Sequence, residues 1–246
     1  MDTEYDLKEE QQGVEQFLNI TRWHEQRWGK FTSSENHKLM GSGRKKDDLF
    51  GVAAMTYINK KASEIGLNFY EQPELEEVKS LLHGKYYEEQ AFERFVLETK
   101  INNLALCGSE NPIFIPNQKY IKYAGGSPDA VSIDDEGGLP KVIVEIKNPK
   151  NPSIHYERLF WKTAQDVEDN NIQAYTQIQD LMWICGSEIG YFVSHDSRRK
   201  KKSEQIKIIE IKPNKIFVED LEYRLTKAIE IIELKHKILS DEQKQN

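Results

Sequence analysis

Three residues with metal-binding and acid–base side chains, Asp129, Glu145 and Lys147, lie in a stretch that predicts two β-strands joined by a turn. Successive side chains of a strand alternate faces, so Glu145 and Lys147 project from the same face. If the two strands pair as a hairpin, Asp129 comes to lie beside them. Two close carboxylates favour a divalent cation, and a lysine beside that cation can orient or help to deprotonate a water molecule. These side chains are suited to metal-assisted hydrolysis of a phosphodiester.

Glutamate and glutamine residues on two expected helices could extend this cluster. Glu88 could add a third carboxylate, directly or through water, although composition alone indicates an ordinary exposed helix charge. Gln173 and Gln177 are four residues apart and share a helix face. A glutamine on that face could hydrogen-bond the lysine or a phosphate oxygen, and a plain polar helix face is the alternative.

An arginine followed by hydroxyl residues, Arg27 and then Thr32 to Ser34, forms a candidate phosphate pocket near the N-terminus. Guanidinium binds phosphate through paired hydrogen bonds, and serine donates further ones. We expect the neighbouring His24 and tryptophans to pack rather than bind. The six histidines form no metal-binding pattern. The expected metal is therefore hard and oxygen-bound, with Mg²⁺ preferred and Mn²⁺ a possible substitute.

The 246 residues, 38% hydrophobic and 30% charged, suit one α/β domain spanning 1–246, with an N-terminal arm at 1–20. The two cysteines, Cys107 and Cys185, argue against a disulfide framework, a zinc ribbon or an iron–sulfur cluster. The acidic, polar start is no signal peptide, and no apolar run could span a bilayer. These features predict a soluble, cytoplasmic protein.

The net charge of −7 speaks against a nucleic-acid partner, but basic residues cluster locally. Residues 198–202 are five consecutive cations, and 44–46 form a shorter basic run. Each run alone could be a solvated loop. Together with a candidate phosphodiesterase site they favour DNA.

The apolar patterning predicts a central mixed β-sheet flanked by helices. We expect a turn-linked series of strands, then a helix, two strands joined by the 198–202 run, and a C-terminal helix and tail over 214–246. The expected helices cover 47–65, 73–99 with an interruption near Gly84, 167–184 and 214–239. The expected strands cover 112–115, 120–123, 130–133, 142–147, 189–194 and 206–211.

Taken in order, five short motifs resemble those of the YqaJ-type viral recombinase family within the PD-(D/E)xK nucleases. They are Trp-His-x-x-Arg-x-Gly-x-x-Thr-x-Ser from Trp23, Gly-Lys-x-Tyr-Glu from Gly84, Ser-Pro-Asp from Ser127, Glu-x-Lys-x-Pro from Glu145, and Gln-x-Gln from Gln177 followed by Met-Trp. The resemblance covers about residues 23–196. It implies a restriction-endonuclease-like core.

The resemblance also implies an activity: degradation of one strand of linear double-stranded DNA from its 5′ end, leaving a 3′ single strand for recombination by strand annealing. It implies that Lys147 activates water, that Gln177 positions this lysine, and that Arg27, Ser34 and Ser127 capture the 5′-phosphate. Family members form ring-shaped trimers, and a single-strand annealing protein is the implied partner, inside a bacterial host cell if a phage encodes the chain. The implied metal ligands are Asp129, Glu145, the main-chain carbonyl of Ile146, and Glu88; Arg44 would join the phosphate pocket, and Leu81 would act as an apolar wedge in the DNA path.

The chain departs from the family pattern at Ser33 and at Asn148, and its loops after Asp129 and after Lys147 are enlarged. The enlarged loops put two implied features in question, the packing between subunits and the geometry of the DNA channel. The substituted residues leave the implied chemistry intact. Two alternatives remain open: a restriction-type endonuclease of the same superfamily, and a catalytically silent DNA-binding protein.

Overall fold

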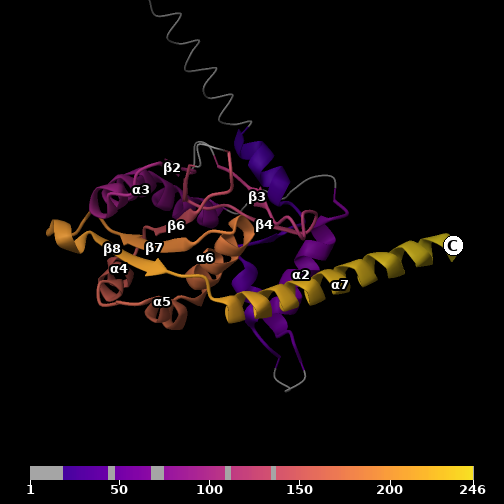
Figure 1. Ribbon diagram of the computed structural model, residues 1–246. Helices are drawn as coiled ribbons and strands as arrows, with labels where there is room; N and C mark the ends of the chain where they lie inside the picture. The colour runs from indigo at the N-terminus through magenta and orange to yellow at the C-terminus, as the bar shows by residue number, and fades with distance from the viewer. Residues whose placement is uncertain (1–18, 44–47, 68–74, 109–111, 134–136, 246) are drawn as a thin grey trace, which may run out of the picture.

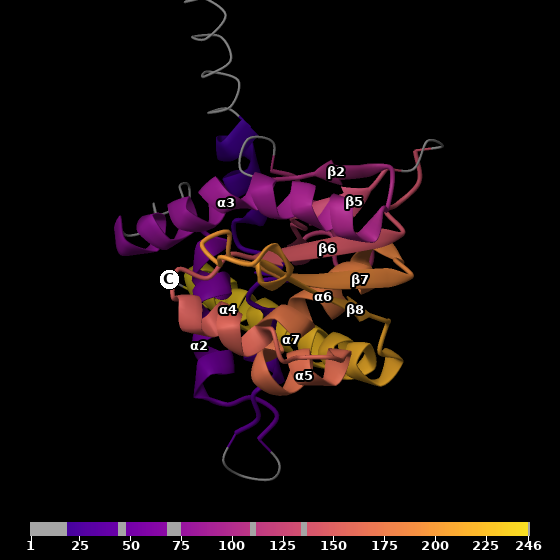
Figure 2. The same ribbon diagram turned by 90° about the vertical axis from the view of Figure 1, so that its left-hand side faces the viewer.

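A five-stranded mixed sheet with helices on both faces forms the centre of the computed structural model, which describes residues 19–43, 48–67, 75–108, 112–133 and 137–245 (Figures 1 and 2). β6 and β7 pair in parallel, and the other neighbours pair antiparallel. The predicted central mixed sheet flanked by helices is confirmed. Across the sheet the strands are β2 (Leu104–Leu106), β5 (Ala130–Ser132), β6 (Val142–Lys147), β7 (Ile189–His195) and β8 (Ile206–Ile211).

The predicted hairpin between β5 and β6 is present, with Ala130 opposite Val144. Continued by one residue, this register places Asp129 opposite Glu145. The start of β5 and the carboxyl ends of β6 and β7 therefore lie at the same edge of the sheet, because β5 runs against β6 and β6 runs with β7.

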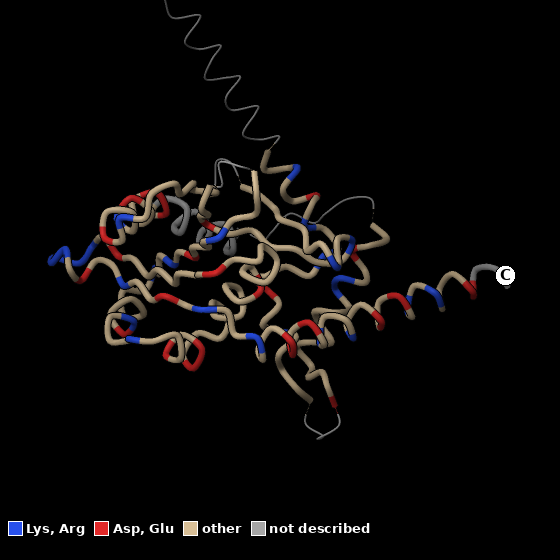
Figure 3. Tube along the Cα trace, in the orientation of Figure 1, with Lys and Arg blue, Asp and Glu red and all other residues tan. Residues whose placement is uncertain are grey.

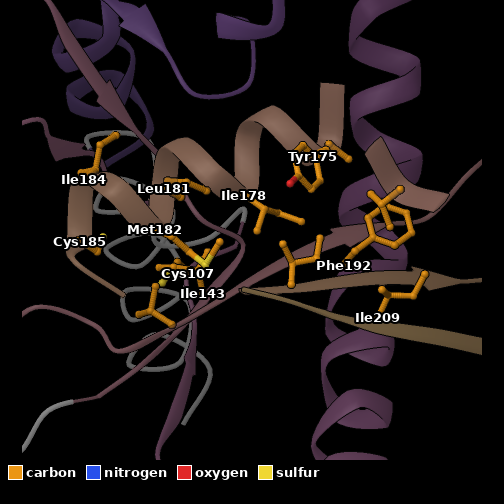
Figure 4. Packing of buried hydrophobic residues seen from close by; sticks show 14 of the residues in the cluster. Cys107, Ile143, Tyr175, Ile178, Leu181, Met182, Ile184, Cys185, Phe192 and Ile209 are labelled. Atoms are coloured by element: carbon orange, nitrogen blue, oxygen red, sulfur yellow. The ribbon is translucent and has the colours of Figure 1, made fainter. Parts of the chain in front are cut away.

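Buried residues on the two faces of β6 decide where its polar side chains point. Ile143 packs in the core with α6 (Ile172–Cys185), and Figure 4 shows it below Met182 of that helix. Val144 and Ile146 pack on the opposite face against α3 (Leu75–Thr99). By the two-residue period of a strand, Glu145 and Lys147 share the Ile143 face, toward α6.

A second, three-stranded sheet lies beside the first, with β4 (Ala124–Gly126) between β1 (Phe31–Thr32) and β3 (Ile115–Pro116). It packs with α2 (Val52–Glu64), η1 (Asn36–Met40) and the long α7 (Lys215–Gln245). A Cβ atom on Gly126 would lie 2.5 Å from Leu181 Cδ2, so this position has to be glycine for β4 to reach α6. The chain then runs directly from β4 into Ser127 and Asp129.

Several short helices and the short strands β1, β2 and β4 were not predicted. α4 (Pro152–Arg158) begins at the Asn151 cap, whose side chain accepts from Ser153 N–H. The expected helix at 167–184 is instead α5 (Ala164–Asn170) and α6, separated at Asn171, whose side chain caps α6 by accepting from Ala174 N–H. β1 and β2 span two and three residues, too short for a visible alternation of apolar residues.

Four other expectations were wrong in detail. The segment 120–123 is a turn, because the Asn117 side chain accepts from the N–H groups of Lys119 and Tyr120. The helix expected from residue 47 begins at Val52, since Gly51 still bonds back to Gly41. α3 is continuous through Gly84. The expected strand at 112–115 begins at Ile115, whereas β6, β7, β8 and α7 match their predicted positions within a few residues at their starts.

Residues 1–18 of the expected N-terminal arm lie outside the described residues, and a helical segment covers 19–27. Within the described residues, no helix combines the length and apolar character needed to cross a bilayer.

Candidate active site

Asp129, Glu145 and Lys147 come together at the sheet edge, as the hairpin predicts. Lys147 Nζ lies 2.5 Å from Glu145 Oε1 and 3.4 Å from Gln177 Oε1. Gln177 Nε2 donates to Glu145 Oε2 at 2.7 Å. Asp129 Oδ2 accepts from the Ile146 N–H at 2.6 Å. The two carboxylates are thus fixed by a lysine, an amide and the main chain.

Burial and mutual repulsion act on the charges of this cluster. Glu145 is 1% exposed, and its burial and the nearby Asp129 raise the pKa of its carboxyl. Burial also raises the pKa of Asp129, against the opposing effects of Lys147 and the Ile146 N–H. Burial alone would lower the pKa of Lys147, but Glu145 and Asp129 outweigh it and the pKa is raised. The cluster therefore holds one lysine against two carboxylates and would gain from further positive charge.

The oxygen atoms of this cluster fit a hard divalent cation. Two carboxylates and main-chain carbonyls such as that of Ile146 are the ligands that Mg²⁺ and Mn²⁺ prefer. The Ile146 side chain is buried against α3, so this residue can offer its main chain alone. In the described part of the chain, no three His, Cys, Asp or Glu side chains form a group of metal-binding geometry.

Glu88 lies on α3 near the same edge. It contributes to the raised pKa values of Glu145 and Cys107. A Cβ atom on Gly108 would lie 2.5 Å from Glu88 Oε2, so the glycine leaves the space that this carboxylate occupies. Gly108 thus keeps Glu88 within electrostatic range of the cluster.

One face of α6 connects this cluster to the N-terminal hydroxyl residues. Gln173, Gln177 and Asp180 follow the four- and three-residue spacing of a helix face. Gln173 Nε2 donates to Ser34 O at 3.4 Å, and Asn36 Nδ2 donates to the buried Asp180 Oδ2 at 2.7 Å. The prediction that Gln173 and Gln177 share a functional face is consistent with these contacts.

Arg27, Ser34 and Ser127, the candidate phosphate pocket, form a hydrogen-bonded group, and Ser127 lies two residues before Asp129 along the chain. Arg27 Nη1 donates to Ser127 Oγ at 3.1 Å, and Nη2 donates to Ser34 Oγ at 3.3 Å. Trp23 Nε1 donates to Ser127 Oγ at 2.8 Å, and its ring lies 4.4 Å from the Arg27 guanidinium carbon. The arginine is therefore held between an aromatic face and two hydroxyls.

Among the described residues, the charge of Arg27 has no ion-pair partner. Burial lowers the pKa of its guanidinium, with Tyr57 and Glu35 opposing this from a distance. No carboxylate of the described residues lies within 4 Å of it to form a salt bridge. Arg27 is partly buried, and a cation withdrawn from water in this way favours an anion as its partner.

The comparison with protein families agrees with this geometry. The model of the YqaJ-like viral recombinase domain matches residues 22–188, which contain every element of the cluster and the pocket. The chain belongs to the YqaJ-like viral recombinase family. No curated protein sequence matches it.

Solved structures share the fold of this YqaJ-like chain. The alkaline exonuclease LHK-Exo from Laribacter hongkongensis is similar with a TM-score of 0.71 and 20% identity, over 91% of this chain and 98% of that one. The same values hold for LHK-Exo in complex with dAMP. A phage-related exonuclease from Haemophilus somnus 129PT has a TM-score of 0.62 and 16% identity, over 85% and 96%. The fold is of the PD-(D/E)xK type, and family and fold together support a nuclease.

Two residues of the predicted YqaJ-type site cannot be placed. Arg44 lies outside the described residues, and Leu81 lies within α3 at a position whose side chain is not described. Sequence reasoning also missed contributors. Trp23 was expected to pack, but it also binds Ser127 and stacks on Arg27. Its spacing of four from Arg27 on one helix could have indicated this. Gly108 and Asp180 carried no sequence signal.

Proposed function

We propose that this protein is a divalent-metal-dependent 5′→3′ exonuclease. It would degrade one strand of linear double-stranded DNA and leave a 3′ single strand for recombination by strand annealing. The observation that carries the proposal is the Arg27 guanidinium, which bonds Ser34 and Ser127 and has no ion-pair partner among the described residues, with Ser127 two residues before Asp129. A pocket for a terminal phosphate beside a hydrolytic cluster favours an enzyme that starts at an end.

In this proposal Mg²⁺, or Mn²⁺ in its place, is held by Asp129, Glu145 and the Ile146 carbonyl, with Glu88 acting through water. The bound ion would supply charge neutralisation at the scissile phosphate and a more acidic water. Lys147, held as an ammonium by Glu145 and Gln177, orients a water molecule and stabilises the negative charge that develops on its oxygen as the water gives up its proton to solvent. Arg27, Ser34 and Ser127 bind the 5′-phosphate and fix the next phosphodiester at the cluster.

The short path from pocket to cluster supports removal of one nucleotide at a time. Ser127 and Asp129 are separated by one residue, and two residues of extended chain cover roughly 7 Å. This is of the order of one nucleotide step. A restriction-type endonuclease needs no such end pocket, and a silent binding protein needs no Glu145–Lys147–Gln177 network.

Two further parts of the proposal rest on family resemblance. Relatives form ring-shaped trimers, which would let a chain with a net charge of −7 hold DNA in a locally basic channel. A single-strand annealing protein would receive the product strand. Both are testable by measuring the mass of the protein in solution and by co-purification.

The deciding experiment incubates the protein and Mg²⁺ with three substrates: linear duplex with 5′-phosphate, the same duplex with 5′-hydroxyl, and closed circular plasmid. We expect rapid release of mononucleotides from the phosphorylated duplex, slower release from the hydroxyl duplex, and an intact circle. Cutting of the circle would support the endonuclease instead. No digestion with any divalent ion would support the binding protein.

A further inference from the structure

The basic loop, defined as residues 196–204 between β7 and β8, presents the five consecutive cations of residues 198–202. It forms the basic tip at the far left of Figure 3, and Figure 2 shows it between α3 and α4. The loop follows the carboxyl end of β7, at the sheet edge where β6 ends in Lys147. Nothing in the proposed chemistry so far uses these charges.

Arg198 ties this loop to the segment that follows the catalytic lysine. Its Nη1 donates to Lys150 O and its Nη2 to Pro149 O, both at 3.1 Å. Its Nε and Nη2 also bond the two oxygens of Asp196, at 2.7 and 2.9 Å. The Arg198 guanidinium is thus engaged with Asp196 and with two main-chain carbonyls, and it serves as an anchor of the loop.

The anchored loop borders both elements that carry the cluster. A small cavity is lined by Tyr87, Asn148, Pro149 and His195 together with residues 196–198 of the loop. Tyr87 precedes Glu88 on α3, and Asn148 follows Lys147. His195 Nδ1 also lies 3.2 Å from Asn148 Oδ1. The loop is therefore fixed at the rim of the site.

The remaining cations of the loop differ in how they are paired. Arg199 and Lys201 both bond Glu204, at 2.7 and 3.1 Å. Lys200 and Lys202 are exposed, and neither forms an ion pair with another described residue. The ammonium groups of Lys200 and Lys202 thus lie at the edge of the site, on a loop that Arg198 anchors.

The pocket, the cluster and the basic loop follow one another along this sheet edge. Ser127 precedes β5, Lys147 ends β6, and the loop follows β7, the next strand across. Two strand spacings amount to about 10 Å. A DNA strand with its 5′ end at Arg27 and its scissile phosphate at the cluster would therefore continue toward the loop.

We propose that Lys200 and Lys202 bind phosphates of the duplex ahead of the cut. The inference rests on the proposed exonuclease function and names a substrate contact for it. Each neutralised phosphate releases counterions, so each lysine adds to the salt dependence of binding. The contact would hold the uncut duplex in line with the site between successive cleavages.

The test measures the dissociation constant for a 5′-phosphorylated DNA hairpin of 20 base pairs, without divalent ions, across a range of salt concentrations. Lys200→Ala with Lys202→Ala should reduce the slope of log K against log [salt] by about 2, since each phosphate contact contributes about 0.9. Affinity at low salt should fall roughly tenfold. Lys200→Arg with Lys202→Arg should retain the slope.

The matched control removes two exposed lysines at the other end of the sheet, Lys141 and Lys215, by alanine substitution. It should keep the wild-type slope. If the Lys200/Lys202 variant also keeps that slope, the proposed contact is wrong. Cleavage of the same hairpin with Mg²⁺ is scored separately. If the Lys200/Lys202 variant shows the reduced slope but the wild-type protein cuts no DNA, the exonuclease proposal is wrong and the loop remains a DNA contact.

Discussion

The Gln177 amide and the Lys147 ammonium each bond a different oxygen of the Glu145 carboxylate. Gln177 Nε2 lies 2.7 Å from Oε2, and Lys147 Nζ lies 2.5 Å from Oε1. Gln177 Oε1 also faces the lysine at 3.4 Å. One helix residue therefore fixes both the carboxylate and the lysine on β6, and each of the other site features can be tested in relation to this arrangement.

Gln177→Ala should reduce turnover of phosphorylated duplex by about 10- to 100-fold, since residues that orient metal ligands typically contribute this much. It should also raise the Mg²⁺ concentration needed for half-maximal activity, because Glu145 would be held less firmly. Steady-state kinetics over a range of Mg²⁺ concentrations measures both. Gln165→Ala removes an exposed glutamine on α5 as the control. Equal kinetics for the two variants would show that Gln177 does not position the cluster.

Arg27→Ala should erase the preference for 5′-phosphorylated over 5′-hydroxyl ends, because it removes the cation of the pocket. Loss of charge-assisted hydrogen bonds corresponds to an increase of about 10- to 100-fold in KM for the phosphorylated end. Arg22→Ala, on the same N-terminal helical segment and exposed, should change neither end. A preserved preference in Arg27→Ala would refute the pocket assignment.

Gly108→Ala should lower activity about as much as Glu88→Gln, because the added methyl group would occupy the space of the Glu88 carboxylate. Comparison of the two variants in the same nuclease assay checks this. Gly66→Ala is the control, since a Cβ atom there would meet nothing within 4 Å. Full activity in Gly108→Ala would mean that the position of Glu88 is unimportant.

Asp180→Asn should change how stability depends on pH. Burial raises the pKa of Asp180 from 3.8 to about 6, although Ser33 and Asn36 oppose this. Between these values the folded protein binds more protons than the unfolded one, so stability falls as pH rises through this window. The Asn36 contact can persist to the asparagine carbonyl.

The stability that the raised pKa of Asp180 contributes at low pH is lost above about pH 6. This loss in the free energy of unfolding amounts to roughly 3 kcal/mol at most. Asp180→Asn should therefore unfold at a higher temperature than the wild type at pH 7, and the difference should vanish near pH 4. Thermal unfolding followed by circular dichroism at several pH values measures it. A difference that does not vary with pH would contradict the assignment of a charged, buried Asp180.

The sequence predicted the hairpin and its cluster because alternation in 142–147 fixes which residues share a face. It also predicted β8 and α7, because their apolar residues repeat over enough positions to indicate a strand and a helix. It failed at 120–123, where the aromatic residues suggest a strand but the Asn117 side chain closes a turn. Such a choice depends on one side-chain hydrogen bond, which periodicity does not reveal.

The charged residues of the site could be predicted from the sequence, but the residues that position them could not. Asp129, Glu145 and Lys147 stand out by type and spacing. Gly108 matters through the space beside Glu88, and Trp23 through a contact with Ser127, which is 104 positions away. Contacts between such distant segments arise from tertiary packing, and no local pattern encodes them.

The central claim is that the cluster of Asp129, Glu145 and Lys147 hydrolyses DNA. The most direct test compares Lys147→Ala with Lys141→Ala, which lies just before the opposite end of the same strand, in single-turnover cleavage and in binding of a 5′-phosphorylated duplex. We expect Lys147→Ala to lose about 10³-fold in cleavage rate while its dissociation constant stays within a few-fold, and Lys141→Ala to match the wild type. Cleavage by Lys147→Ala at the wild-type rate would contradict the account.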